Sequence, residues 1–320
     1  MSITVVGSIA YDTVKTPFGE RERMLGGAAV HFALAASFFD DVRVVGPVGE
    51  DFGEEQVDVM RRRGVDVEGI ERVASGKTFF WHGEYGWDLN SRETIDTQLG
   101  VFEGFEPKLT EAALASDVLF LANIQPDLQR GVRAQLPDAR FVALDSMNLW
   151  IDIARDSLVA AIAEVDCVIL NDAELRQLTN KPNLVSAARE VLTWRPPSGS
   201  VGRGPSVVVA KQGEYGAALI TREGFFALPA YPLETVIDPT GAGDTFAGGL
   251  VGYVAAHPDE PLGDELLRRA MAHASVLASF NVEEFGTERI ERLEASEIAA
   301  RIKELHAMTQ FSGAPLALRG

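Results

Sequence analysis

One short stretch of the sequence carries the residue types best suited to chemistry. Residues 238–249 read Asp-Pro-Thr-Gly-Ala-Gly-Asp-Thr-Phe-Ala-Gly-Gly, and an apolar helical segment begins at once. The proline and the glycines predict an irregular turn, so the N–H groups of Gly241, Ala242 and Gly243 lack partners inside the helix. Together with the positive end of the helix dipole, these groups predict an anion hole that binds phosphate. Gly243 is also expected to need the positive φ that glycine tolerates.

Asp244 stands directly after this turn, and its carboxylate has two interpretations. An acid in the first turn of a helix can do no more than complement the helix dipole, which is worth ~0.3–1 kcal/mol. The alternative is a general base that takes a proton beside a bound phosphate. The residue types and their spacing leave both interpretations open.

The rest of the sequence indicates how this stretch is positioned. Short β-branched runs alternate with helical patterns, which is typical of βαβ units on a parallel sheet. The expected strands are 3–7, 42–46, 117–121, 140–144, 166–170 and 206–210. The expected helices are 27–38, 52–63, 126–135, 151–163, 184–194, 243–256, 263–280 and 295–307. Ligands bind past the carboxyl ends of such strands, so Asp12, which follows the first strand, should reach the site.

Two stretches interrupt this alternation. Residues 77–100 are aromatic strand material with no helix nearby, and we expect them to form a small separate sheet with residues 10–25. Arg195 to Ser206 is rich in Pro, Gly and Ser, which predicts a surface loop. A domain linker is the alternative, but the residues after it lack enough strands for a sheet of their own. We therefore expect one α/β domain over residues 1–320.

Composition excludes several classes of protein. Hydrophobic residues make up 46% of the 320 residues, and 29 basic against 47 acidic residues give a net charge of −18. A disordered chain is excluded, and the acidity argues against nucleic acid or an anionic membrane as partner. The lone Cys167 predicts a packed hydrophobe in a reducing compartment. With no basic residue before Lys15 and no apolar run near the ~18–20 residues of a membrane span, we expect a cytoplasmic protein.

Other chemistries lack their usual motifs. Gly76-Lys77-Thr78 resembles the end of a P-loop, but Glu71 stands where the first glycine belongs. The glycine after Gly243 is Gly248, which breaks the dinucleotide-binding spacing. Neither a Gly-x-Ser-x-Gly elbow nor a His-Glu-x-x-His pair occurs. Hydride transfer, serine hydrolysis and zinc-peptidase chemistry are therefore not indicated.

Residues 238–249 closely resemble the C-terminal signature of the ribokinase-like (PfkB) carbohydrate kinases. The resemblance extends over nearly the whole chain. Further blocks similar to the family follow in its order: Val5-Val6-Gly7-Ser8-Ile9 with Asp12, Gly26-Gly27-Ala28-Ala29, Val45 to Gly53, Asn171-Asp172-Ala173-Glu174 and Lys211 to Gly216. The resemblance implies an α/β fold of three αβα layers, with a mainly parallel central sheet and a small β-sheet lid from about 10–25 and 77–100.

The resemblance also implies a reaction. In the family, the residue at the Asp244 position takes a proton from a sugar hydroxyl, whose oxygen attacks the γ-phosphate of ATP, while the anion hole neutralises charge. The substrate-binding positions are Asp12, Gly26, Gly27 and His31. The positions that face ATP and Mg²⁺ are Asn171, Glu174, Lys211, Gly213, Gly216 and His273.

Three of these assignments have plain structural alternatives. Asn171 and Glu174 hold the waters of Mg²⁺, or they form a helix cap with a first-turn acid. Asp238 and Thr240 match a site for a monovalent cation such as K⁺, or they belong to the chemistry of the turn. His273 flanks the adenine, or it packs within its helix.

The acceptor is the least defined part of the site. The family's Gly-Gly motif commonly continues with Lys-Gly-Ala-Asn, where this chain has Ala28, Ala29, Val30 and His31, so a simple ribokinase does not follow. Asp12 remains, and a carboxylate accepts both protons of a vicinal diol. We expect an ATP-dependent kinase for a small sugar or sugar-like polyol. A nucleoside kinase, in which the aromatic lid and His31 meet a base, is the alternative, and a non-catalytic nucleotide- or sugar-binding member is the third.

The lid segment leads to further expectations. Its aromatic residues between 79 and 87 could cover a sugar, stack on a base, or pack between lid and body. Glu84 is a candidate polar contact, and Arg92 is the nearest lid cation for an acidic sugar. A sheet this small cannot bury both faces, so we expect a homodimer joined through residues 79–87.

Overall fold

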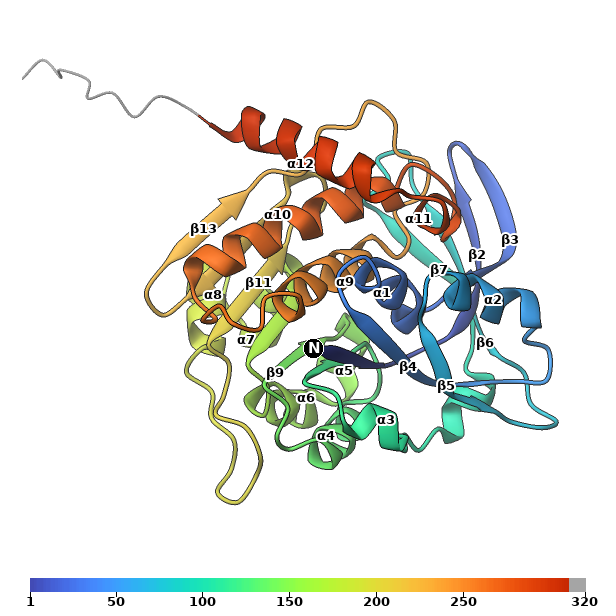
Figure 1. The fold of residues 1–320 in the computed structure, drawn as a ribbon, viewed down its shortest axis with the longest axis horizontal. Helices are drawn as coiled ribbons and strands as arrows, with labels where there is room; N and C mark the ends of the chain where they lie inside the picture. The colour runs from blue at the N-terminus through green and yellow to red at the C-terminus, as the bar shows by residue number, and fades with distance from the viewer. Residues whose placement is uncertain (311–320) are drawn as a thin grey trace, which may run out of the picture.

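A nine-stranded sheet forms the centre of the protein (Figure 1). The structure is a computed structural model that describes residues 1–310. The strand order is β13-β12-β11-β10-β9-β8-β1-β4-β5, and only the pairs β11–β12 and β12–β13 are antiparallel. The strands are β1 Ser2–Val6, β4 Asp41–Val48, β5 Asp66–Arg72, β8 Val118–Leu121, β9 Phe141–Asp145, β10 Cys167–Asn171, β11 Val207–Lys211, β12 Ala217–Thr221 and β13 Phe225–Leu228.

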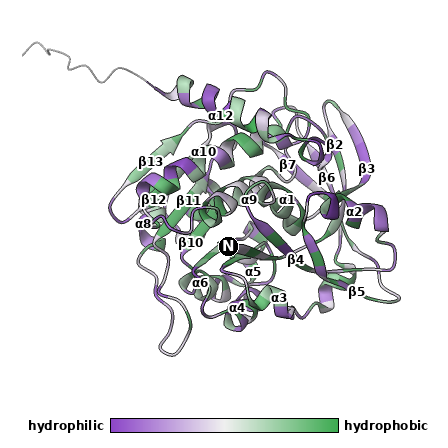
Figure 2. Cartoon of the chain, in the orientation of Figure 1, coloured by the Kyte–Doolittle hydropathy of each residue, from purple (hydrophilic) through white to green (hydrophobic). Residues whose placement is uncertain are grey.

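The inner strands are apolar along their length because helices cover both faces of the sheet. Every residue of β8 and β9 is buried, and Figure 2 shows the neighbouring strands β10 and β11 as largely hydrophobic. The six predicted strands are confirmed. Cys167 is fully buried, and burial raises the pKa of its thiol, as expected for a packed hydrophobe. The edge strands β5 and β13 carry exposed residues, which is why their apolar pattern was too weak to predict.

Helices form a layer on each face of the sheet, as predicted. The layer of α1, α9 and α10 lies over one hydrophobic core, and α4, α6 and α8 lie over a second (Figure 1). The helix expected over 151–163 is two helices, because Ala154 leaves the helical conformation at φ −143°. The helices are α1 Ala28–Ala36, α2 Glu54–Arg62, α3 Glu111–Leu114, α4 Pro126–Gln135, α5 Asn148–Ile153, α6 Arg155–Ala163, α7 Asp172–Thr179, α8 Leu184–Val191, α9 Ala242–Ala255, α10 Asp264–Asn281, α11 Glu288–Glu291 and α12 Ala295–Thr309, with 3₁₀ turns at Gly100–Gly104 and Gly213–Tyr215.

A second sheet of four strands covers one end of the central sheet and forms the lid (Figure 1). Its order is β3-β2-β6-β7, with β2 Ala10–Thr16, β3 Gly19–Gly26, β6 Phe79–Tyr85 and β7 Arg92–Gln98. The strands β2 and β6 are parallel, and the other two pairs are antiparallel. The two segments predicted for this sheet are therefore confirmed.

One face of the lid is turned toward the body. The hydroxyl of Tyr85 accepts a hydrogen bond from Thr240 of the body at 3.2 Å. Side chains alternate along a strand, so Phe79, Trp81 and Tyr85 share this inner face. Phe79 packs against Phe102 of the body with ring centroids 5.6 Å apart. These aromatic residues therefore lie between lid and body, which was one of the three expected roles.

The long connection before β11 is a loop, as predicted. Arg195 to Ser206 contains no helix or strand and joins α8 to β11. Among residues 1–310, no helix combines the length and the apolar character that a membrane crossing requires.

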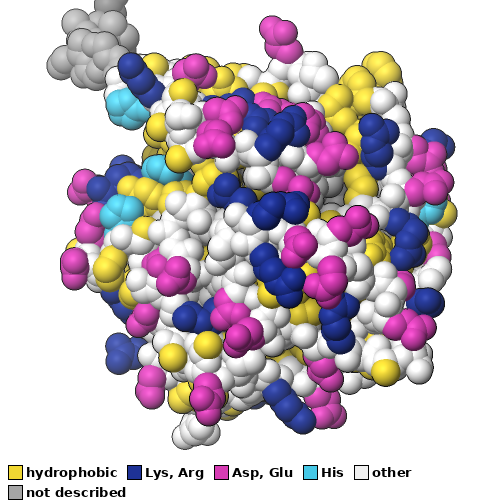
Figure 3. Space-filling view, turned by 45° about the vertical axis from the view of Figure 1, so that its right-hand side comes forward, with side chains coloured by type: hydrophobic (Ala, Val, Ile, Leu, Met, Phe, Trp, Pro, Cys, Tyr) yellow, Lys and Arg dark blue, Asp and Glu magenta, His cyan; other side chains and the backbone are white. Residues whose placement is uncertain are grey.

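The homodimer joined through residues 79–87 stays a prediction, and the structure shows that the exposed edge beside this segment is strand β7. All seven residues of β7 are exposed, and an open strand edge is a template for pairing with a second chain. Trp87 is 89% exposed and Ile95 is 48% exposed. Charges of both signs are interspersed over this side of the molecule (Figure 3), so two copies would meet without repulsion of a single sign.

Sedimentation velocity at micromolar concentration should give the mass of a dimer. The variant Ile95→Glu should shift the distribution toward the monomer, because it places a charge on the edge. A monomer mass for the unmodified protein would contradict the prediction.

Candidate active site

Helix α9 begins at the turn that the sequence predicts as an anion hole. Gly241 is the N-cap and has a left-handed backbone with φ 74°. The N–H of Ala242 donates to the carbonyl of Pro239 at 3.2 Å, so the expectation that this group is free was wrong. Within residues 1–310, the N–H groups of Gly241, Gly243 and Asp244 have no backbone acceptor. These three donors at the positive end of a helix are suited to bind phosphate.

A buried hydrogen-bond network holds this turn from beneath. Asn281 at the end of α10 donates to the carbonyl of Thr240 at 2.7 Å, and its Oδ1 accepts from the hydroxyl of Thr245 at 3.0 Å. The same Oδ1 lies 3.2 Å from Nδ1 of His31, which is 2% exposed. Burial lowers the pKa of His31, so its imidazole is neutral. The structure therefore places His31 behind the turn as a support, where the sequence led us to expect a contact with the acceptor.

The two glycines of the turn are required for different reasons. A Cβ atom on Gly241 would lie 2.3 Å from Cε1 of His31, and the left-handed backbone there disfavours any other residue. Gly243 does not have a positive φ, contrary to expectation. A Cβ atom on Gly243 would lie 3.0 Å from Nζ of Lys211. Gly243 therefore leaves space between the helix start and the lysine.

Carboxyl groups and one lysine meet beside the anion hole. Lys211 ends β11, and its Nζ pairs with Oδ2 of Asp145, at the end of β9, over 2.7 Å. Burial opposes the charge of Lys211, but Asp145, Glu174 and Asp244 together raise its pKa. Burial raises the pKa of Asp145 to about 6 and that of Glu174 to about 7, although Lys211 counteracts both shifts. Burial also raises the pKa of Asp244, which suits a group that must accept a proton.

Asn171 and Glu174 form the helix cap that was the plain alternative for this pair. Oδ1 of Asn171 accepts from the N–H of Glu174, and Oε2 of Glu174 accepts from the N–H of Asn171, each at 2.8 Å. Oε1 of Glu174 has no partner among the described residues. One free carboxylate oxygen fits a Mg²⁺ ion that keeps most of its waters. No group of three His, Cys, Asp or Glu side chains within residues 1–310 could hold a metal directly.

Asp12 lies on the lid strand β2, with 7% of its surface exposed. Gly26 makes room for it, because a Cβ atom there would lie 2.0 Å from Oδ2 of Asp12. Gly27 caps α1 with φ 98°, and a Cβ atom would lie 2.4 Å from a backbone carbonyl oxygen. Burial, together with Asp238 and Asp244, raises the pKa of Asp12 to about 7. The structure therefore brings Asp12 within electrostatic reach of Asp244.

Asp238 and Thr240 show the turn chemistry that was one of their two interpretations. Asp238 is fully buried, and its two carboxylate oxygens accept from the N–H groups of Thr240 at 2.8 Å and Gly286 at 3.0 Å. The hydroxyl of Thr240 reaches Tyr85 of the lid. The pair thus fastens the lid beside the anion hole, and a K⁺ site at this position stays a prediction.

The tight turn after β11 depends on its glycines. Gly213 has φ 57° and Gly216 has φ 100°. A Cβ atom on Gly216 would lie 2.1 Å from the carbonyl oxygen of Leu228. This turn follows Lys211 closely, so its backbone lies on the predicted nucleotide side of the site.

His273 does not lie at the anion hole. Its ring stacks on Tyr253 with centroids 4.2 Å apart and meets Phe39 edge-on at 5.8 Å. Its Nδ1 lies 2.8 Å from the carbonyl of Arg269, one turn earlier in α10. The structure therefore supports the packed histidine rather than the contact with adenine.

Two residues of this site escaped the sequence analysis. Asp145 directly follows the predicted strand 140–144 and ends β9, and its position at a carboxyl end was the signal that could have identified it. Asn281 is the last residue of α10 and is buried. A polar residue among apolar neighbours was the one signal in the sequence that could have identified it.

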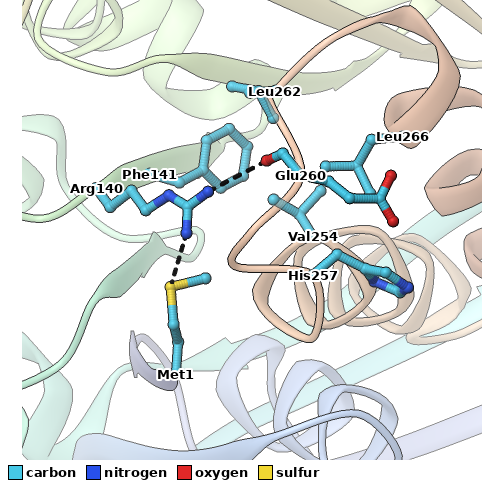
Figure 4. A pocket seen from close by; sticks show the side chains of 8 residues that line it. All are labelled: Met1, Arg140, Phe141, Val254, His257, Glu260, Leu262 and Leu266. Atoms are coloured by element: carbon cyan, nitrogen blue, oxygen red, sulfur yellow. Dashed lines mark hydrogen bonds between the residues drawn. The ribbon is translucent and has the colours of Figure 1, made fainter.

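A small cavity lies at the opposite, amino-terminal end of the strands (Figure 4). Arg140 donates there to Sδ of Met1 at 3.4 Å and to the carbonyl of Glu260 at 3.3 Å. The volume of about 30 Å³ has room for one or two waters and not for a sugar. The side chains that line it are Met1, Arg140, Phe141, Val254, His257, Glu260, Leu262 and Leu266.

We predict that Gly241→Ala destabilises the protein much more than Gly243→Ala. The alanine at 241 carries about 1–2 kcal/mol of left-handed backbone strain and also meets the fixed ring of His31, whereas Lys211 can move its flexible end away from position 243. Urea unfolding of the two variants measures the difference. Equal losses of unfolding free energy would show that the turn does not depend on this contact.

We predict a pH-dependent stabilisation by Asp12→Asn. Burial raises the pKa of Asp12 in the folded protein from its ordinary value of 3.8 to about 7, so the folded state holds the proton more tightly. The contribution of Asp12 to stability is therefore present at low pH and is lost as the pH rises toward 7. Thermal unfolding at each pH gives the free energy of unfolding of both proteins. The gain in this free energy for Asp12→Asn over the unmodified protein should increase from pH 5 to pH 8 by on the order of 2 kcal/mol. The exposed lid variant Asp96→Asn should show no such trend, and a gain independent of pH would contradict the assignment.

Comparison with known proteins agrees with this geometry. Residues 2–292 match the pfkB family of carbohydrate kinases. The cytidine kinase of Thermococcus kodakarensis is 29% identical over 268 residues, which cover 81% of this chain and 91% of that protein. The fructokinase of Klebsiella pneumoniae is 26% identical over 275 residues, covering 80% and 85%. The structure of Burkholderia thailandensis nucleoside kinase in complex with inosine shares the fold, with a TM-score of 0.79 and 20% identity over 95% of this chain and 98% of that chain. The chain therefore belongs to the pfkB family of carbohydrate kinases.

Proposed function

We propose that this protein is an ATP-dependent kinase that transfers the γ-phosphoryl group to a hydroxyl of a small sugar or sugar-like polyol. The observation that carries the proposal is the position of Asp244. It shares the helix start with the free N–H groups of Gly241 and Gly243, and it lies within electrostatic reach of Asp12. A donor set for phosphate, a base and an acceptor for hydroxyl protons are thereby combined in one site.

In the proposed mechanism, Asp244 takes the proton of the acceptor hydroxyl. The acceptor oxygen forms its bond to the γ-phosphorus while the bond to the leaving oxygen of ADP breaks. The N–H donors of the α9 start and the ammonium of Lys211 stabilise the charge on the transferring group. Mg²⁺, held through water by Glu174, would neutralise part of the triphosphate charge when bound. The lid excludes water, which strengthens each of these interactions.

Asp12 supports the recognition of a polyhydroxylated acceptor. Its buried carboxylate can accept hydrogen bonds from two hydroxyls, each worth about 1.5–3 kcal/mol when the acceptor is charged. Ala28 and Ala29 follow the Gly-Gly pair and are both buried, so they add no polar contact. Asp12 therefore carries a larger share of the recognition than it would beside the family's usual lysine and asparagine.

A nucleoside is the second candidate acceptor. Trp81 and Tyr85 lie on the inner face of the lid, where an aromatic ring can stack on a base. The similarity to a cytidine kinase and to a nucleoside kinase favours this alternative, and the similarity to a fructokinase favours the sugar. In either case the same carboxylate of Asp12 would hold the diol. The intact Asp244 and its glycines argue against a non-catalytic member.

We predict that Asp244→Asn lowers kcat by about 10²–10⁴ and leaves the fold and ATP binding largely intact, because a positioned base is removed. Asp264→Asn is the matched control, since Asp264 is also a first-turn acid of a long helix but lies at the start of α10. Steady-state kinetics and calorimetric ATP binding check both variants. Turnover of Asp244→Asn within threefold of the unmodified protein would remove Asp244 from the mechanism.

A panel of free sugars, polyols and nucleosides, assayed for ADP release with ATP and Mg²⁺, tests the proposed function directly. We expect turnover with at least one acceptor, and Asp12→Ala should raise the KM for that acceptor with little change in the KM for ATP. A deoxy analogue should lose affinity for the unmodified protein but not for Asp12→Ala. A preference for nucleosides above tenfold, roughly 1.4 kcal/mol, would select the second candidate. No turnover with any acceptor would contradict the kinase proposal.

A further inference from the structure

A second cavity lies at the amino-terminal ends of β9, β10 and β11, away from the proposed active site. Among the residues that line it, Arg140 directly precedes β9, Asp166 directly precedes β10, and Arg203 lies on the loop before β11. The opposite ends of β9 and β11 carry Asp145 and Lys211, which belong to the proposed active site. A molecule bound in this cavity therefore does not compete with ATP or with the acceptor.

The cavity is large enough for a small metabolite and is lined mainly by charged side chains. Its volume is about 360 Å³, and small-molecule sites commonly measure about 300–1,000 Å³. Three guanidinium groups line it, those of Arg133, Arg140 and Arg203. Two carboxyl groups, those of Asp138 and Asp166, lie among them. The lining thus combines cations that suit an anion with oxygens that can accept hydrogen bonds.

Arg133 is a buried cation that forms no ion pair within residues 1–310. Only 4% of its surface is exposed. Its Nε donates to the carbonyl of Glu164 at 3.1 Å, and its Nη1 donates to the carbonyl of Leu136. The third nitrogen, Nη2, makes no hydrogen bond to this part of the chain. Buried charges in proteins are normally paired, because leaving water costs free energy. Arg133 therefore brings a positive charge and a free donor to the wall of the cavity.

The other two guanidinium groups also lack a carboxylate partner in the part of the chain that the structure describes. Arg140 donates to Sδ of Met1 and to the carbonyl of Glu260, which are both neutral acceptors (Figure 4). Arg203 is exposed and makes no side-chain hydrogen bond there. Elsewhere in this acidic chain arginines do pair with carboxylates, as Arg130 does. Three arginines without ion pairs around one cavity are therefore suited to an anion from outside the chain.

The two carboxyl groups of the cavity differ in what they still offer a ligand. Oδ2 of Asp166 accepts from the N–H of Val142 at 2.9 Å, which holds it against the sheet. Burial raises the pKa of Asp166, while this N–H group and the charges of Arg133 and Arg203 act against the shift. Asp138 is exposed, and its side chain has no hydrogen-bond partner within residues 1–310. Asp138 therefore remains available to accept hydrogen bonds from a ligand.

We propose that this cavity binds a small phosphomonoester that also carries sugar hydroxyls, as a second ligand of the protein. Guanidinium groups present forked N–H donors that match phosphate oxygens, and here no ion pair occupies them. The carboxylate of Asp138 accepts hydrogen bonds from the hydroxyls of the same molecule. The proposal stands independently of the proposed function, because the cavity shares no residue with the proposed active site.

Calorimetric titration with ribose 5-phosphate tests the proposal, on protein saturated with Mg²⁺ and a non-hydrolysable ATP analogue. We expect one site, whose Kd rises at least about tenfold in Arg203→Gln, because charge-assisted hydrogen bonds are lost. Arg62→Gln is the matched control, since Arg62 is an exposed arginine of α2 outside the cavity. Asp12→Ala should also leave the Kd unchanged, because Asp12 lies on the lid.

Three outcomes of this titration would overturn the proposal. The first is the absence of binding to the unmodified protein. The second is an Arg203→Gln variant that binds as tightly as the unmodified protein. The third is binding that Asp12→Ala weakens, which would place the ligand at the acceptor position.

A comparison with inorganic phosphate tests the part of the proposal that concerns the hydroxyls. The unmodified protein should bind ribose 5-phosphate at least about tenfold more tightly than inorganic phosphate, through added hydrogen bonds. Asp138→Ala removes a negative charge and should tighten the binding of inorganic phosphate. The same variant removes a hydroxyl acceptor, so the preference for ribose 5-phosphate should fall at least about threefold. Equal affinities for the two probes, or an unchanged preference in Asp138→Ala, would overturn the assigned class of ligand.

Discussion

Repulsion between like charges is the constraint on which the site depends. Several carboxyl groups converge on one end of the sheet: Asp12, Asp145, Glu174, Asp238 and Asp244. The proposed ligand, a nucleoside triphosphate, is itself an anion, and the body opposes these charges with Lys211. Burial makes protonation easier for most of these groups, which relieves part of the repulsion near neutral pH. In the proposed reaction, the positive partial charges of the backbone N–H groups and a metal ion would add to the charge of Lys211 at the phosphates.

The fold meets this constraint with backbone N–H groups, which donate hydrogen bonds to phosphate and add no negative charge to the site. The left-handed Gly241 directs unpaired N–H groups out of α9, and a neutral, buried His31 supports the turn without adding charge. Asn281 connects this support to the carbonyl before the turn and to the hydroxyl after it. These hydrogen bonds hold the turn without a buried counter-charge, although Nε2 of His31 has no hydrogen-bond partner among the described residues.

Strands and helices with a regular pattern of apolar residues were predictable from the sequence. Contacts between side chains that only the fold brings together were not. The inner strands and long helices follow from apolar runs, and residues 238–249 identified the helix start with Asp244. The free N–H groups differ from the prediction because the local geometry of Pro239 engages Ala242. His31 differs from its predicted contact with the acceptor, and the choice between two roles for His273 stayed open, because no spacing rule says whether a helix histidine faces a cleft or a neighbouring helix. Asn281 lies 250 residues from His31, so only the fold brings them together.

The lid is built from two separate parts of the chain, and this has consequences for how such a protein can change. The hairpin β2–β3 and the hairpin β6–β7 are separated by α1, β4, α2 and β5 of the body, and they join through the parallel pair β2–β6. Asp12 lies on the first hairpin, and Arg92 begins the last strand of the second. Recombination that exchanges one contiguous block would therefore import half a sheet with unmatched edges and half of the lid's polar groups. A new acceptor specificity is reached more readily by point substitutions within both hairpins than by transplanting a lid from a relative.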